Sequence, residues 1–169
     1  MEILRIPKER IGALKEAKGQ IEKHFSVQLS ISNEGEVEIG GENVWAYLAK
    51  DTVQAIGRGF GPREALKLFK DDYSFYLINL REHFSTENAI RRMKGRIIGE
   101  KGKVKGEIEQ ATGSEICVYG HTVGIIAPSD AMEYVKEAIE MILNGAPLTA
   151  VTNQLANAKE ALMFGRLKG

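Results

Sequence analysis

Two glycines three residues apart, Gly99 and Gly102, lie at the centre of the stretch whose residue types could bind an anion. Glycine at both ends of so short a loop allows a sharp turn and leaves no Cβ to obstruct a flat or charged ligand. The backbone amides of such a loop, together with the N-terminal end of a helix that follows it, attract phosphate groups. Lys101, Lys103 and Lys105 lie in or beside the loop. The pattern therefore predicts a phosphate-binding loop between two helices.

Two common phosphate-binding motifs do not fit this stretch. A Walker A loop ending just after Gly102 would need glycine at Ile97 and a hydroxyl-bearing residue at Val104. A dinucleotide-binding fingerprint requires a strand directly before its glycines. Residues 87–93 instead follow a Ser-Thr pair that can cap a helix, so we expect them to be helical. A glycine-rich connection with incidental lysines is the remaining structural alternative.

The charge balance restricts any nucleic-acid binding to a local patch. Lys plus Arg and Asp plus Glu number 23 each, so the chain has no global basic field. Between Arg91 and Lys105, however, every charged residue except Glu100 is basic. Positive charge is therefore concentrated where the loop is.

The sequence offers no set of residues for catalysis or metal binding. The single cysteine, Cys117, excludes an internal disulfide and a cysteine-based zinc site, and is typical of a reducing, cytoplasmic compartment. His24, His83 and His121 lack metal-ligand spacing, and no Ser or Cys nucleophile stands beside a base. No apolar run is long enough to cross a membrane. We expect a non-enzymatic protein without cofactor, metal or membrane partner.

The two halves of the sequence resemble each other. A shift of 87 positions places Ile11-Gly12 on Ile98-Gly99, and Lys18-Gly19-Gln20-Ile21-Glu22 on Lys105-Gly106-Glu107-Ile108-Glu109. The same shift aligns apolar residues of the following strands and helix. The chain is therefore predicted to contain two copies of one module, at residues 1–70 and 71–169.

Each copy is predicted to have the order strand, helix, helix, strand, strand, helix. In the first copy these elements are expected near residues 2–6, 8–14, 15–24, 27–31, 37–39 and 44–56. A short helix, 63–69, and a longer one with an apolar stripe from Leu148 to Leu162 follow the two copies. The stripe is expected to pack against the first module, with docking of another protein as the alternative.

The run Ile97-Ile98-Gly99-Glu100-Lys101-Gly102-Lys103-Val104-Lys105-Gly106-Glu107-Ile108 resembles the signature of the KH (K-homology) RNA-binding module. The resemblance implies an α+β fold with two tandem type I KH modules (βααββα), each followed by an additional helix. In such a module the loop clamps the backbone of about four nucleotides while an apolar groove holds the bases. The residues then expected to bind RNA are Arg96, Ile97, Ile98, Gly99, Glu100, Lys101, Gly102, Lys103, Val104, Lys105, Ile108, Ile116 and Val118.

The first copy departs from the signature where the second glycine is replaced by Lys15. A side chain there would obstruct a sugar-phosphate backbone, so this copy is expected to bind RNA weakly or not at all and to contact protein or the second copy instead. A degenerate copy followed by an intact one resembles the archaeal KH-domain ribosomal-RNA-processing family, related to the small-subunit assembly factors Krr-one and partner of Nob-one.

This family resemblance implies binding of single-stranded RNA near the 3′ end of small-subunit ribosomal RNA during ribosome biogenesis. It also implies work beside a PIN-domain endonuclease and contact with the alpha subunit of translation initiation factor two. Two alternatives stay open: a general KH adaptor for RNA, as in exosome caps, and a protein-interaction scaffold with a vestigial RNA site.

Overall fold

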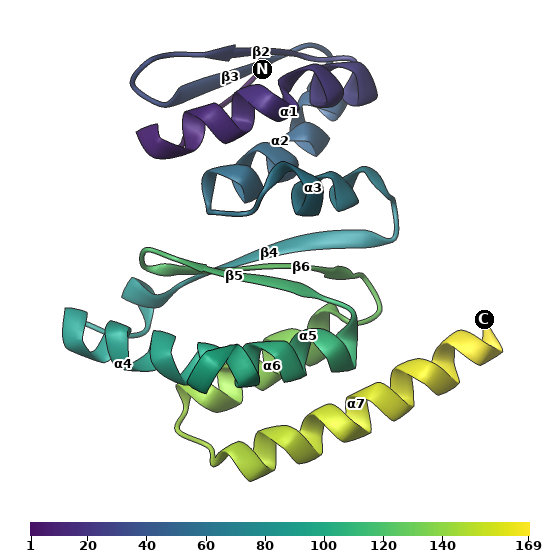
Figure 1. The fold of residues 1–169 in the computed structure, drawn as a ribbon. Helices are drawn as coiled ribbons and strands as arrows, with labels where there is room; N and C mark the ends of the chain where they lie inside the picture. The colour runs from purple at the N-terminus through teal and green to yellow at the C-terminus, as the bar shows by residue number, and fades with distance from the viewer. The chain divides into compact units, whose positions relative to one another are not determined.

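The computed structural model describes residues 1–169 and divides them into two compact units, Met1–Asp71 and Asp72–Gly169 (Figure 1). Each unit contains one three-stranded antiparallel sheet, with strand orders β1-β3-β2 and β4-β6-β5. In both sheets the last strand of the unit lies in the centre, between the other two. None of the helices combines the length and apolar character needed to cross a membrane.

The first unit places helices on one face of its sheet. Its elements are β1 (Glu2–Arg5), the 3-10 turn η1 (Lys8–Arg10), α1 (Ile11–Phe25), β2 (Gln28–Ile31), β3 (Glu36–Gly40) and α2 (Asn43–Gly57), followed by α3 (Pro62–Ala65) and η2 (Leu66–Phe69). Val37 and Ile39 alternate along β3 toward the helices and are fully buried, as are Leu14 and Ile21 of α1. Apolar residues at every second position of a strand, and at every third or fourth position of a helix, lie on one face of the element and bury that face.

The two helices predicted between β1 and β2 are a single helix in this unit. The turn η1 leads directly into α1, and Gly12 and Lys15 lie inside that helix rather than in a loop. The helix continues because its buried stripe is uninterrupted at helical spacing, through Leu14, Ala17, Ile21 and Phe25. The predicted order βααββα is therefore wrong for residues 1–70, whose order is βαββα before the two short helices.

The second unit has the predicted order βααββα, followed by a long helix. Its elements are β4 (Tyr73–Asn79), η3 (Leu80–Glu82), α4 (Glu87–Ile98), η4 (Glu100–Gly102), α5 (Lys103–Thr112), β5 (Glu115–Tyr119), β6 (Thr122–Pro128), α6 (Met132–Leu143) and α7 (Leu148–Lys168). Figure 1 shows α4, α5 and α6 along one side of the sheet, and α7 on the far side of these helices. The core lies between the sheet and the first helical layer, and includes Ile97, Ile108, Ile125, Ile139 and Ile142.

The apolar stripe of α7 is occupied within the second unit. Val151, Leu155, Ala158 and Leu162 are buried, and α7 packs against α5 and α6. At the far end of the helix, the Arg166 guanidinium forms two hydrogen bonds of 3.0 and 3.1 Å to the Asp130 carboxylate, which lowers the pKa of Asp130. Both sequence-based assignments of the stripe, to the first module and to another protein, are therefore wrong.

Two supporting interactions occur in both units. In the first unit, the Arg10 guanidinium donates to the backbone oxygens of Ile56 and Phe60, at 2.9 and 2.7 Å, where α2 ends. Arg96 donates in the same way, at 3.0 and 2.9 Å, to two backbone oxygens where α6 ends. A helix glutamate also accepts a bond from the amide of the following strand in each unit, as in Glu109 to Ile116 and Glu22 to Leu29. What the first unit lacks is a counterpart of α4 and of the loop after it.

Candidate nucleic-acid interface

The loop between α4 and α5 is built from left-handed backbone. Gly99 has φ 76° and ψ 171°, which ends α4, and its amide donates to the Gly95 oxygen at 2.8 Å. Lys101 follows at φ 55° and Gly102 at φ 76°, and α5 begins at the next residue. Positive φ is costly for a residue with a side chain, so Lys101 is held in this conformation by the turn around it.

The two glycines of the loop are required for different reasons. A Cβ on Gly99 would lie 2.5 Å from Cγ2 of Val104 and 2.7 Å from its backbone nitrogen, so glycine is needed there by the protein's own packing. A Cβ on Gly102 would meet nothing within 4 Å. Within the protein, only the positive φ favours glycine at position 102. The space that a Cβ would take is open to a ligand.

Some backbone amides of the loop form hydrogen bonds within the protein and others do not. The Gly102 amide donates to the Gly99 oxygen at 3.1 Å, and the Lys103 amide donates to the Glu100 oxygen. The amides of Glu100 and Lys101, the first two of the 3-10 turn, have no acceptor within the protein. No side chain caps the loop. The predicted phosphate cradle is therefore limited to two amides, flanked by lysines.

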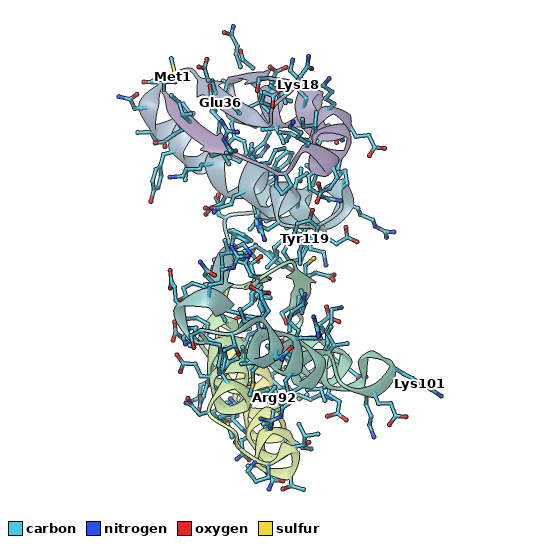
Figure 2. All side chains as sticks on the ribbon, turned by 90° about the vertical axis from the view of Figure 1, so that its left-hand side faces the viewer. Met1, Lys18, Glu36, Arg92, Lys101 and Tyr119 are labelled. Carbon is cyan, nitrogen blue, oxygen red and sulfur yellow. The ribbon has the colours of Figure 1, made fainter.

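Cations without a partner in the protein lie on the loop and on α4. Lys101 and Lys103 are exposed and make no ion pair within the protein. Figure 2 shows Lys101 extending away from the ribbon at the end of the loop. Arg91, which is exposed, and Lys94, which is half-buried, lie on the preceding helix three residues apart and therefore on one side of it. These two were left out of the predicted site, although the local excess of basic residues could have identified them.

Two of the cations predicted to bind RNA are used by the fold itself. The Arg96 guanidinium is committed to the carbonyls at the end of α6. The Lys105 ammonium pairs with the Glu109 carboxylate at 3.2 Å. Their side chains therefore position α5 and α6 rather than extending toward a ligand.

The apolar residues predicted for the groove are divided between the core and the surface. Ile97, Val104, Ile108 and Ile116 are buried in the core, so the expectation that all of them line an open groove is wrong. Apolar residues one turn apart on α5 face the sheet and hold the helix there. Ile98 and Val118 are partly exposed, and Glu100 is exposed. Of the predicted apolar contacts, Ile98 and Val118 are the more accessible to a ligand, whereas Val104 keeps only 8% of its surface exposed.

The element order of the second unit and its Gly-x-x-Gly loop define a type I KH domain. In agreement, the family model of the second KH domain of PNO1, described as a eukaryotic-type KH domain (KH-domain type I), matches residues 74–160. The chain belongs to the PNO1-type family of KH-domain proteins. This match confirms the family indicated by the sequence and covers the second unit.

Two similar proteins and one solved structure agree with this assignment. The KH domain-containing protein MJ0443 of Methanocaldococcus jannaschii is 45% identical, over 86% of this chain and 68% of the relative. The pre-rRNA-processing protein PNO1 of Chaetomium thermophilum is 31% identical over 64% of this chain, which corresponds to 43% of the length of PNO1. A chain in the a/eIF2alpha–aDim2p–rRNA complex of Pyrococcus horikoshii OT3 is 36% identical, with a TM-score of 0.85 over 95% of this chain and 94% of that one.

Proposed function

We propose that the second unit binds single-stranded RNA through the loop from Gly99 to Lys103, at the 3′ end of small-subunit ribosomal RNA during ribosome biogenesis in the cytoplasm. The observation that carries the proposal is the open side of Gly102, where a Cβ would meet nothing and two unpaired lysines flank the space. The ribosomal RNA in the complex of the Pyrococcus horikoshii relative supports the choice of RNA class.

The chemistry of binding follows from the groups that are free. The amides of Glu100 and Lys101 donate to phosphate oxygens, and the Lys101 and Lys103 ammonium groups supply the attraction. Glu100 opposes phosphate by one charge and is outnumbered by the lysines. The bases then lie toward Ile98 and Val118. The strand must be single, because paired bases would hide the edges that a KH domain contacts. Gly102 lets the sugar-phosphate backbone approach closely.

The first unit is proposed to be a shortened KH copy that does not bind RNA. It keeps the sheet order, the arginine–carbonyl bonds and the glutamate–amide bond of the second unit, but its loop position is helical. Its role is then contact with protein. A PIN-domain endonuclease and the alpha subunit of translation initiation factor two are the proposed partners, and the second is supported by the a/eIF2alpha named with the Pyrococcus horikoshii relative.

A titration at several salt concentrations tests the RNA function. The full chain is titrated with a labelled single-stranded oligonucleotide that carries the 3′-end sequence of small-subunit ribosomal RNA, and with a duplex of the same sequence. With three or four phosphate contacts, the logarithm of affinity should fall against the logarithm of salt with a slope of about −2 to −3. Absence of binding, or affinity independent of salt, would refute the RNA function and favour a protein-interaction scaffold. Equal affinity for unrelated sequences would favour a general RNA adaptor.

A further inference from the structure

A cleft of about 290 Å³ opens next to the loop, between the first turns of α5 and α7. Its lining includes Lys103, Val104 and Glu107 from α5 and Leu148, Thr152 and Asn153 from α7. This volume is near the lower end of the range for small-ligand sites, which suits one planar ring rather than a larger molecule. The cleft is lined by α7, which follows the βααββα module.

The cleft is continuous with the proposed RNA-binding loop. Lys103 is both the residue that follows Gly102 and the first residue of α5, so it belongs to the loop and to the cleft wall. A strand held at the loop therefore has this cleft as a neighbouring place for its next base. This continuity argues for an occupant that belongs to the same RNA strand.

The lining combines apolar surface with hydrogen-bonding groups that have no partner in the protein. Leu148 is 48% exposed and provides most of an apolar wall for the face of a ring, to which Val104, at 8% exposure, adds a small area. Thr152 and Asn153 are exposed at the rim, with free side-chain donors and acceptors. Glu107 is half-buried and forms neither an ion pair nor a hydrogen bond with another side chain.

The unpaired carboxylate indicates which part of a nucleotide enters the cleft. Glu107 repels phosphate, so the negatively charged backbone belongs with Lys103 outside and not in the cleft. A carboxylate accepts hydrogen bonds from the amino group of a base, as acidic side chains do from cytosine N4. Adenine, cytosine and guanine carry an exocyclic amino group and uracil does not.

We propose that this cleft binds the base of a nucleotide that flanks the loop-bound stretch, and that Glu107 selects a base with an exocyclic amino group over uracil. The proposal rests on the RNA-binding function proposed above. Lys103 pairs with the phosphate of that nucleotide, and Val104 and Leu148 contact the face of the base. The Asn153 side-chain amide forms a further hydrogen bond with the edge of the base. The helix α7 thereby adds a position of sequence recognition beyond the nucleotides held at the loop.

The test compares oligonucleotides that differ by one nucleotide at either end. A tetranucleotide that binds the full chain is selected from a randomised pool, and is extended at its 5′ or 3′ end by adenine, cytosine, guanine or uracil. At one of the two ends, the wild-type protein should bind the amino-bearing extensions about 5- to 20-fold more tightly than the uracil extension. The other end should show no such preference.

Variants of Glu107 separate base recognition from general charge effects. Glu107→Ala should reduce the amino-to-uracil ratio to near one, because the amino-bearing extensions lose their hydrogen-bond acceptor while the uracil extension loses only a nearby negative charge. Glu107→Gln should reduce the ratio by tightening the uracil extension, since an amide can also donate. Glu160→Ala removes an exposed carboxylate of α7 that does not line the cleft, and should leave the ratio unchanged.

The outcomes distinguish this inference from the function on which it rests. A tetranucleotide that binds in a Gly102-dependent manner, with no base preference at either end, would overturn the inference and leave the RNA function standing. A preference that persists in Glu107→Ala would also overturn it. If no single-stranded RNA binds the full chain, the proposed function and the inference both fall.

Discussion

Replacing Gly102 with aspartate tests whether the open side of the loop is where RNA lies. The position has φ 76°, and Asp and Asn are the residues with side chains that adopt such backbone most readily. A Cβ at this position would meet nothing within 4 Å, so the fold should tolerate the substitution. Gly102→Asp and Gly102→Asn have nearly the same shape, and the difference between them isolates the effect of one negative charge.

The size of that difference follows from Coulomb's law. A carboxylate about 5 Å from a phosphate, in an effective dielectric between about 20 and 80, raises the free energy of binding by about 1 to 3 kcal/mol. Gly102→Asp should therefore bind single-stranded RNA about 5- to 150-fold more weakly than Gly102→Asn. Both should bind more weakly than the wild type, because both obstruct close approach of the sugar-phosphate backbone.

The assay is a fluorescence titration of the three proteins with one labelled oligonucleotide, accompanied by urea unfolding to verify that each variant is folded. Lys15→Glu is the matched control, because Lys15 is the residue that the sequence repeat places at the Gly102 position and it lies on exposed helix surface in α1. That control changes the net charge by two units, more than Gly102→Asp does, and should still affect binding less.

Equal affinities of Gly102→Asp and Gly102→Asn would refute the reasoning, since they would mean that no phosphate lies near this position. Equal losses in Gly102→Asp and Lys15→Glu would refute the assignment of binding to the second unit. The second result would show that negative charge weakens binding wherever it is placed, so that net charge rather than the loop governs the interaction.

Three further predictions concern the support of the loop and of α7. Gly99→Ala should lower the free energy of unfolding by about 2 to 4 kcal/mol, measured in urea, because its Cβ would collide with the first turn of α5. Arg96→Met should lower it by about 1 to 3 kcal/mol by removing a charged donor from two carbonyls, and should weaken RNA binding far less than Lys101→Met does. In an NMR titration, Arg166→Gln should raise the pKa of Asp130 back toward 3.8, since the guanidinium hydrogen bond holds it lower. The small stabilisation from this half-exposed pair is present above pH 3.8 and is lost as the pH falls through the folded-state pKa.

The loop of the second unit was predictable from local sequence, whereas its absence from the first unit required closer attention to helical phase. Residues 99–103 contain no apolar side chain, so no stripe can continue across them. Residues 12–16 align with the same stretch, but Leu14 keeps the buried stripe of α1 in phase. Aligning the two copies on Gly12 and Gly99 therefore predicted a loop where packing continues the helix. The decisive signal was the apolar spacing and not the glycine.

Which cations are available to a ligand could be predicted only in part. The pairing of Lys105 with Glu109 follows from their spacing of one helical turn. The partners of Arg96 are carbonyls 46 and 50 residues further along the chain, where α6 ends, and no local pattern indicates them. The burial of Ile116 likewise depends on how β5 joins the sheet. Local sequence therefore identified the loop, and the tertiary fold determined which of its neighbours face outward.

Comparison of the two units argues that the loop is maintained for a ligand and not for the fold. The first unit forms the same sheet order with a continuous helix, and keeps both the arginine–carbonyl and the glutamate–amide supports. The fold thus has no need of left-handed backbone at this place. In the second unit Lys101 adopts φ 55°, which costs about 1 kcal/mol or more for a residue with a side chain. A conformation that strains the chain, leaves two amides without acceptors and places lysines around an empty space is explained by an anionic partner that supplies the missing bonds.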